Sequence, residues 1–144
     1  MITRTMRDGG NGSRLSDQLL EQALLDVEDL MERSLTSYIV VGEVAKCMVE
    51  KKLLDANKVE VVIKPNGMIE EARRTIKTFF FEGDGLIEDD KGLHYTKNGV
   101  PVYIHLLKRK YKFFKNPDRV VYNYADYLIP NTFDLYWKSR HFVR

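Results

Sequence analysis

The sequence predicts an α/β (α+β) fold in which helices pack on a mixed β-sheet that includes a β-hairpin. Two short β-branched runs, at 37–42 and 58–63, alternate with segments whose apolar residues have helical spacing. Asn98-Gly99 then separates two further β-like runs, and this dipeptide is the strongest short sequence signal for a hairpin. Because hairpin strands are antiparallel, the sequence excludes a simple doubly wound parallel sheet.

The composition is that of an ordinary soluble globular protein. The chain has 144 residues, of which 44% are hydrophobic and 31% are charged, which is enough for one domain with its own core. The net charge of +2 does not by itself indicate nucleic-acid binding. We expect a flexible, glycine-containing tail over residues 1–15 and a single domain over residues 16–144.

Cysteine usage and hydropathy indicate the compartment. Cys47 is the single cysteine, so an internal disulfide is impossible and a reducing, cytoplasmic location is expected. No run approaches the roughly 20 apolar residues that a membrane-spanning helix needs. The first 15 residues contain no apolar signal segment, so we expect no membrane partner.

The first half of the chain predicts helix, strand, helix, strand and helix in that order. A helix is expected after Ser16, a suitable N-cap residue, with one apolar face made of Leu20, Ala23, Leu24, Val27, Leu30 and Met31. Helical spacing returns in 43–54, between the two β-branched runs. A third helix is expected over 68–82, where Gly83 is the predicted stop signal.

The second half predicts the hairpin followed by two helices. The second hairpin strand is expected to run from Val102 to about Leu107. Asn116 and Pro117 have the chemistry of an N-cap and a first helical position, so a helix is expected from there to Pro130. A last short helix within 131–142 is expected to pack Phe133, Tyr136 and Trp137.

Three stretches carry a resemblance to a known family. "IVVGE" (39–43) is a strand that ends in glycine, "KVEVVI" (58–63) is a strand with an acid at an alternate position, and "VPVYIHLL" (100–107) is a later strand. Their order resembles the nucleotidyltransferase superfamily, the polymerase-beta-like fold, over roughly Leu19 to Leu107. The resemblance implies a nucleotidyltransferase-like sheet, with phosphate contacts at the glycine strand end and three carboxylates on the two later strands.

The residues at those positions are the candidate site. Residues two apart in a strand share a face, so paired acids can hold Mg²⁺ ions against a triphosphate. The resemblance places Glu60 at the second carboxylate position and His105 at the third, as candidate catalytic residues. It places Gly42 and Glu43 at the phosphate-binding strand end, and Lys58 at the first carboxylate position, as candidate nucleotide-binding residues.

Two of these residues oppose metal catalysis. A lysine ammonium about 4 Å from a divalent ion is repelled by about 8 kcal/mol at an effective dielectric constant of about 20, and Glu43 would repel a triphosphate. The sequence therefore predicts a site without a bound metal or other cofactor. In a purely structural interpretation, Glu60 and Lys58 are a surface ion pair, and His105 is a packed, hydrogen-bonded histidine.

A basic and aromatic segment follows the later strand. Cations alternate with aromatic rings there, a composition that suits single-stranded nucleic acid. The alternative is a strand end whose aromatic rings enter the core while its lysines stay in water. The candidate nucleic-acid-binding residues are Lys108, Arg109, Lys110, Tyr111, Lys112 and Phe114.

These observations leave three hypotheses for function. In the first, the chain is a degenerate nucleotidyltransferase-like domain, inactive in metal-dependent transfer and retained to bind a nucleotide, a nucleic acid or a protein partner. The second is an active nucleotidyltransferase that uses Glu43 and Glu60 as Mg²⁺ ligands. The third is a single-stranded nucleic-acid-binding module that uses the segment 108–119.

Overall fold

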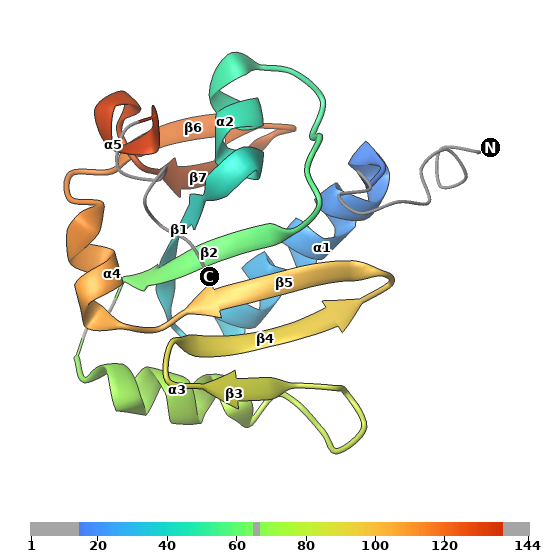
Figure 1. Ribbon diagram of the computed structural model, residues 1–144, viewed down its shortest axis with the longest axis vertical. Helices are drawn as coiled ribbons and strands as arrows, with labels where there is room; N and C mark the ends of the chain where they lie inside the picture. The colour runs from blue at the N-terminus through green and yellow to red at the C-terminus, as the bar shows by residue number, and fades with distance from the viewer. Residues whose placement is uncertain (1–14, 65–66, 137–144) are drawn as a thin grey trace.

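The computed structural model describes residues 15–64 and 67–136 (Figure 1). The elements in chain order are α1 (Asp17–Arg33), β1 (Ser37–Val41), α2 (Gly42–Glu50), β2 (Val59–Lys64), α3 (Ile69–Lys77), β3 (Ile87–Asp89), β4 (Gly92–Lys97), β5 (Val100–His105), α4 (Lys108–Phe113), β6 (Asp118–Tyr122), β7 (Ala125–Ile129) and α5 (Thr132–Tyr136). Among these residues, no helix has both the length and the apolar character that crossing a membrane requires.

A mixed sheet of five strands is the centre of the fold. Its strand order is β1-β2-β5-β4-β3. β2 and β5 are parallel, whereas β1 pairs antiparallel with β2, and β4 pairs antiparallel with both β5 and β3. β6 and β7 form a separate two-stranded sheet, and β7 packs beside β1 (Figure 1). The predicted fold class is therefore confirmed.

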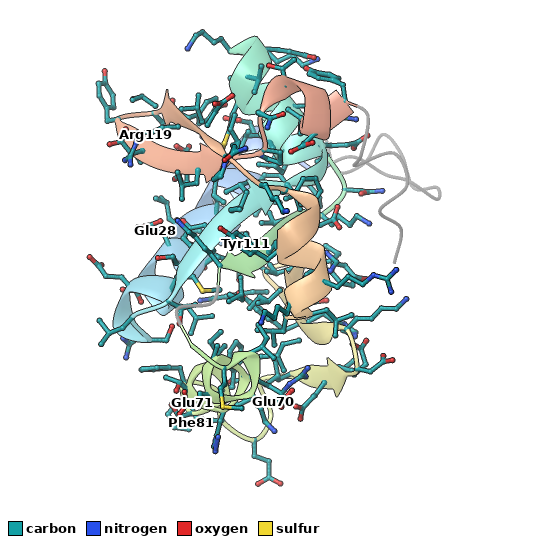
Figure 2. All side chains as sticks on the ribbon, turned by 90° about the vertical axis from the view of Figure 1, so that its left-hand side faces the viewer. Glu28, Glu70, Glu71, Phe81, Tyr111 and Arg119 are labelled. Atoms are coloured by element: carbon teal, nitrogen blue, oxygen red, sulfur yellow. The ribbon has the colours of Figure 1, made fainter. Side chains whose placement is uncertain are left out.

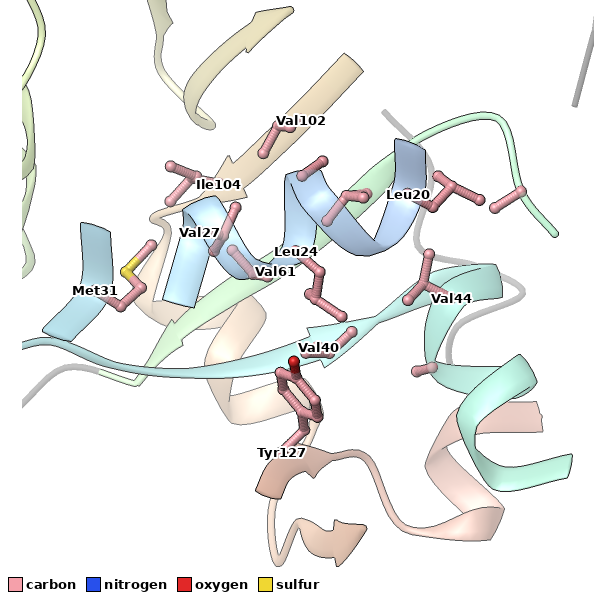
Figure 3. Packing of buried hydrophobic residues seen from close by; sticks show 14 of the residues in the cluster. Leu20, Leu24, Val27, Met31, Val40, Val44, Val61, Val102, Ile104 and Tyr127 are labelled. Carbon is pink, nitrogen blue, oxygen red and sulfur yellow. The ribbon is translucent and has the colours of Figure 1, made fainter. Parts of the chain in front are cut away.

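One face of the sheet is the main core. α1 crosses this face, and its apolar side packs against alternate residues of β1, β2 and β5 (Figure 3). Leu24 and Val27 of α1, for example, belong to the same buried cluster as Val40, Val61 and Val102. The alternation follows from strand geometry, because residues i and i+2 point to the same side of a sheet.

The opposite face of the sheet is apolar at one end and polar at the other. Ile39, Val41 and Val62 form a second buried cluster there, which Phe114 covers from the end of α4. Glu60 shares this face with Val62, and it lies at the end of β2 that α4 leaves uncovered. This division of one face leaves room for polar side chains beside the second cluster.

Two local predictions are confirmed at the level of single hydrogen bonds and torsions. The Oγ atom of Ser16 accepts a hydrogen bond from the backbone N–H of Leu19, so Ser16 is the N-cap of α1. Asn98 and Gly99 have φ values of 52° and 81°, the left-handed pair that a two-residue hairpin turn requires, and they join β4 to β5. Leu15, in the expected tail, is fixed by its N–H donating to the carbonyl oxygen of Ala56.

The predicted helix between Asn116 and Pro130 is wrong. This segment forms the β6–β7 hairpin, with Asn123 and Tyr124 at positive φ in its turn. The segment alternates rather than following helical spacing: Val120 and Tyr122 pack against the core, whereas Val121 is exposed. The alternating burial favours strands, and it outweighs the tendency of Asn116 and Pro117 to start a helix.

Further element boundaries also differ from the predictions, and α2 ends at Glu50 rather than near residue 54. β5 ends at His105 rather than near Leu107, and the chain continues directly into the helix α4. α3 ends at Lys77, well before Gly83, yet Phe79 and Phe80 still pack against the core from the following turns. α5 is shorter than the predicted last helix, and Trp137 lies outside the described residues.

Gly92 allows the close approach of β4 to β5, and its substitution should be strongly destabilising. A Cβ atom there would lie 2.1 Å from the carbonyl oxygen of Ile104, and the φ value of 153° is unfavourable for other residues. We expect Gly92→Ala to lower the free energy of unfolding by about 3 kcal/mol or more, measured by urea denaturation.

Gly99→Ala is the matched control for that measurement. Gly99 also has a positive φ, but a Cβ atom added there would meet no atom of the described residues within 4 Å. Only the left-handed backbone strain remains, so we expect a loss of about 1–2 kcal/mol. Equal losses for the two variants would contradict the close-approach argument.

Candidate functional site

A pocket of about 300 Å³ forms where β1 ends and α2 begins. Val41, the last residue of β1, pairs with Glu60 of β2, so the start of α2 lies directly beside the Glu60 side chain. The segment before β2 closes the other side. The lining residues are Gly42, Glu43, Lys46, Ala56, Asn57, Lys58 and Glu60.

Four predicted site residues therefore line one pocket: Gly42, Glu43, Lys58 and Glu60. Sequence reasoning missed Lys46, although it lies four residues after Gly42 and hence on the same side of α2. Lys46 also contacts the end of the described chain, because its ammonium lies 5.6 Å from the ring centroid of Tyr136.

Gly42 fits this site because it has no side chain. A Cβ atom on Gly42 would lie 2.6 Å from Oε2 of Glu60, and the φ value of 77° is left-handed. Both observations favour glycine at the strand end. The cap residue Val41 has no side-chain acceptor, so it supplies no hydrogen bond to the first N–H groups of α2.

Glu60 is held through both carboxylate oxygens. Oε2 lies 3.8 Å from Nζ of Lys58, and Oε1 lies 3.2 Å from Nε2 of His105. The Glu60 side chain is 12% exposed and that of His105 is 1% exposed. The ion pair between Glu60 and Lys58 that the purely structural interpretation expects is present, with the Lys58 side chain 37% exposed.

Two aromatic rings continue the same face of the sheet. Tyr103 of β5 pairs with Glu60 on one side and with His94 of β4 on the other. The rings of His94 and Tyr103 stack, with centroids 5.1 Å apart and an interplanar angle of 21°. Nζ of Lys58 lies 5.4 Å from the Tyr103 centroid. Sequence reasoning missed both rings, although Tyr103 is two residues from His105 and so shares its face.

The donor set does not fit a catalytic divalent metal. Within residues 15–64 and 67–136, no three His, Cys, Asp or Glu side chains lie close enough together to hold a metal ion. The Lys58 ammonium already occupies the space beside Oε2 of Glu60. A metal ligated by that oxygen would lie next to this positive charge, and their repulsion would weaken metal binding.

A larger cavity lies elsewhere and is a weaker candidate. It measures about 390 Å³ and lies between α1, the turn after α3 and the β4–β5 hairpin. Four of its charged side chains form two ion pairs: Lys97 lies 3.2 Å from Asp26, and Arg33 lies 3.4 Å from Asp29. Arg33 also stacks on Phe79. The smaller pocket is the better candidate, because it joins a strand end, a helix start and a mostly buried carboxylate.

The basic and aromatic segment forms α4 instead of a strand end. Lys108 and Arg109 are exposed. Phe114 is fully buried in the second apolar cluster, and Tyr111, labelled in Figure 2, packs against the same cluster. Phe114 therefore offers no ring face to a base. The side chains of Lys110 and Lys112 lie outside the part of the chain that the structure describes.

Comparison with known proteins is informative only at the level of structure. No model of a known protein family matches the sequence, and no curated protein matches it. One similar structure is an antigenic nucleotidyltransferase-like protein from Paracoccidioides brasiliensis, with a TM-score of 0.60 and 11% identity. That match covers 85% of this chain but only 65% of the Paracoccidioides protein.

A second similar structure is ANT(2")-Ia in complex with adenylyl-2"-tobramycin. Its TM-score is 0.58 at 7% identity, and the match covers 84% of this chain and 74% of that one.

The chain has a nucleotidyltransferase-like fold.

At identities this low, the similarity shows the fold and nothing finer. The expected resemblance is confirmed at that level. Within this nucleotidyltransferase-like fold, the glycine strand end and the acid of β2 meet in one pocket, while a lysine stands beside that acid.

Removal of the Lys58 charge should create metal binding. We expect wild-type protein to show no Mn²⁺ binding at micromolar concentrations, measured by calorimetry or electron paramagnetic resonance. Lys58→Asp places a second carboxylate two residues before Glu60, so this variant should bind Mn²⁺ measurably.

Lys52→Asp is the matched control, because Lys52 also lies two residues from a glutamate, 3.0 Å from Glu50, but on the exposed surface. It should bind no Mn²⁺. Micromolar binding by the wild type, or equal binding by the two variants, would contradict the proposed position of Lys58 at a ligand site.

Nucleic-acid retention through α4 should be purely electrostatic. If the wild type is retained on single-stranded RNA at low salt, we expect Lys108→Glu with Arg109→Glu to abolish retention, because these exposed cations can neutralise phosphates. Lys51→Glu with Lys52→Glu makes the same charge change elsewhere and should leave retention intact. Retention that is insensitive to salt would contradict this prediction.

Proposed function

We propose that the protein is a degenerate nucleotidyltransferase-like domain that binds a nucleotide without a divalent metal. The nucleotide binds in the 300 Å³ pocket that Gly42, Lys46, Lys58 and Glu60 line, here called the α2–β2 pocket. The position of Lys58 carries the proposal. Its ammonium lies 3.8 Å from Oε2 of Glu60 on the pocket wall, where it supplies a positive charge. An ammonium in this position can neutralise phosphate oxygens as a metal ion would, though with a single charge.

Other features of the pocket support an anionic ligand. Lys46 adds a second cation. The N-terminal end of α2, a nine-residue helix, opens into the pocket at Gly42, and its first N–H groups have no partners within the helix. These groups together suit a phosphate monoester or diester.

Glu43 and Glu60 limit how much negative charge the pocket accepts. Two acids and two lysines line it, so the formal charge of the lining is balanced. A triphosphate without Mg²⁺ would meet Glu43 at close range, and like charges repel more strongly where water is partly excluded. We therefore propose a monophosphate or diphosphate ligand in preference to a free triphosphate.

An active transferase is the second candidate function. One observation favours it: Glu43 and Glu60 line the same pocket, so they are the pair of acids that could share Mg²⁺. The metal-free proposal predicts no pyrophosphate release from the four ribonucleoside triphosphates with Mg²⁺ or Mn²⁺. Release that disappears in Glu60→Ala would establish the active candidate instead.

The expected cytoplasmic location remains part of the proposal. It rests on the single cysteine, Cys47, which is buried within α2 and donates to the carbonyl oxygen of Asp55. A nucleotide is the proposed partner, and binding of nucleic acid or of another protein remains an additional hypothesis.

Nucleotide binding should depend on the two lysines and not on metal. We expect calorimetry in EDTA to detect AMP binding, with no gain in affinity on adding Mg²⁺. Lys58→Gln and Lys46→Gln should each weaken AMP binding by about tenfold, because a charge-assisted contact contributes about 1.5–3 kcal/mol.

The control is Lys52→Gln, which removes an exposed lysine that also pairs with a glutamate. It should leave AMP affinity unchanged. Binding that requires Mg²⁺, or that is unaffected by both pocket substitutions, would overturn the proposal.

A further inference from the structure

The sheet face beside the pocket carries a lateral row of side chains. Glu60 of β2, Tyr103 of β5 and His94 of β4 are direct partners in the sheet register. Neighbouring strands lie about 4.8 Å apart, so the Tyr103 ring begins one strand spacing from the pocket wall and His94 follows one spacing later. The row therefore leads away from the pocket in a fixed direction.

The two rings stack against each other, so each covers one face of its neighbour. Their planes differ by 21° and both side chains are partly exposed, His94 to 24%. Nε2 of His94 lies 3.7 Å from Oδ2 of Asp89, a contact that orients the imidazole. On the opposite face, alternate residues of β4 and β5, such as Leu93 and Val102, are buried in the main core. The rings thus point away from the core, toward the side on which the pocket opens.

Lys58 connects the pocket to this surface. Its ammonium lies 5.4 Å from the Tyr103 centroid and 3.8 Å from Oε2 of Glu60, so both contacts are at the long end of their usual ranges. A phosphate in the pocket would attract the ammonium away from the ring. Movement of Lys58 toward the phosphate would bring an aromatic group of the same ligand to the side of Tyr103 that the ammonium now faces.

We propose that the His94–Tyr103 pair is a base subsite, on which the base of a nucleoside monophosphate stacks while its phosphate occupies the α2–β2 pocket. This inference rests on the proposed function. It assigns a binding site to the base, which would contribute affinity in addition to that of the phosphate. Stacking accepts any base, because every base has a π-face, so the subsite recognises nucleosides with little discrimination among bases.

The test compares ligands with and without a base in EDTA. We expect AMP and CMP to bind about tenfold or more tightly than ribose 5-phosphate, since only the first two have a base that can stack on the Tyr103 ring. Tyr103→Leu should reduce AMP affinity to near that of ribose 5-phosphate and change the affinity for ribose 5-phosphate less than about twofold. Tyr103→Phe should retain AMP affinity.

Tyr124→Leu is the matched control, because Tyr124 is fully exposed at the tip of the β6–β7 hairpin. It should not change AMP affinity. If Tyr103→Leu does not fold, NMR on the wild type replaces it: we expect nuclear Overhauser contacts between the adenine protons and the Tyr103 ring. Their absence in saturated complex would overturn the base subsite.

The outcomes separate the two proposals. Equal affinity for AMP and ribose 5-phosphate would overturn the base subsite and leave the phosphate pocket supported. A Tyr103→Leu variant that loses ribose 5-phosphate and AMP equally would also overturn the subsite, because it assigns Tyr103 to maintaining the pocket. Failure of all three ligands to bind would overturn the pocket and the subsite together.

Discussion

The candidate site depends on the contacts that the Glu60 carboxylate makes with its neighbours. It lies on a partly buried strand, with His105 at one oxygen and Lys58 at the other. The start of α2 comes so close that Gly42 has no room for a Cβ atom. A mostly buried charge is tolerated only when it is well compensated, so these neighbours fix the position of Glu60 and Glu60 fixes theirs.

The two faces of the sheet explain why such a site can form without weakening the core. On one face, α1 packs against apolar residues of β1, β2 and β5 in the main core (Figure 3). The other face needs only Phe114 and its cluster to cover β1 and part of β2. The remaining polar positions on that face contribute little to the core, so their chemistry is free to vary.

The separation of an apolar core face from a polar face explains how structures can be similar at 11% and 7% sequence identity. A core requires apolar volume at the right periodicity, and many sequences meet that requirement. A metal site requires particular acids at particular positions. Lys58 beside Glu60 does not disturb the apolar core, but its positive charge opposes a metal site. The fold can therefore be present without transferase activity.

The sequence by itself determined the elements whose signals are local and strong. Ser16 and the apolar stripe specified α1, and Asn98-Gly99 specified the β4–β5 hairpin, because capping and left-handed turns depend on the residues within them. Strand periodicity also grouped Lys58 with Glu60. The tertiary structure decided what depends on contacts distant in sequence. It made 118–129 a hairpin and buried Phe114. It also joined Glu60 to His105 and Tyr103 across parallel strands, a pairing whose register no local pattern encodes.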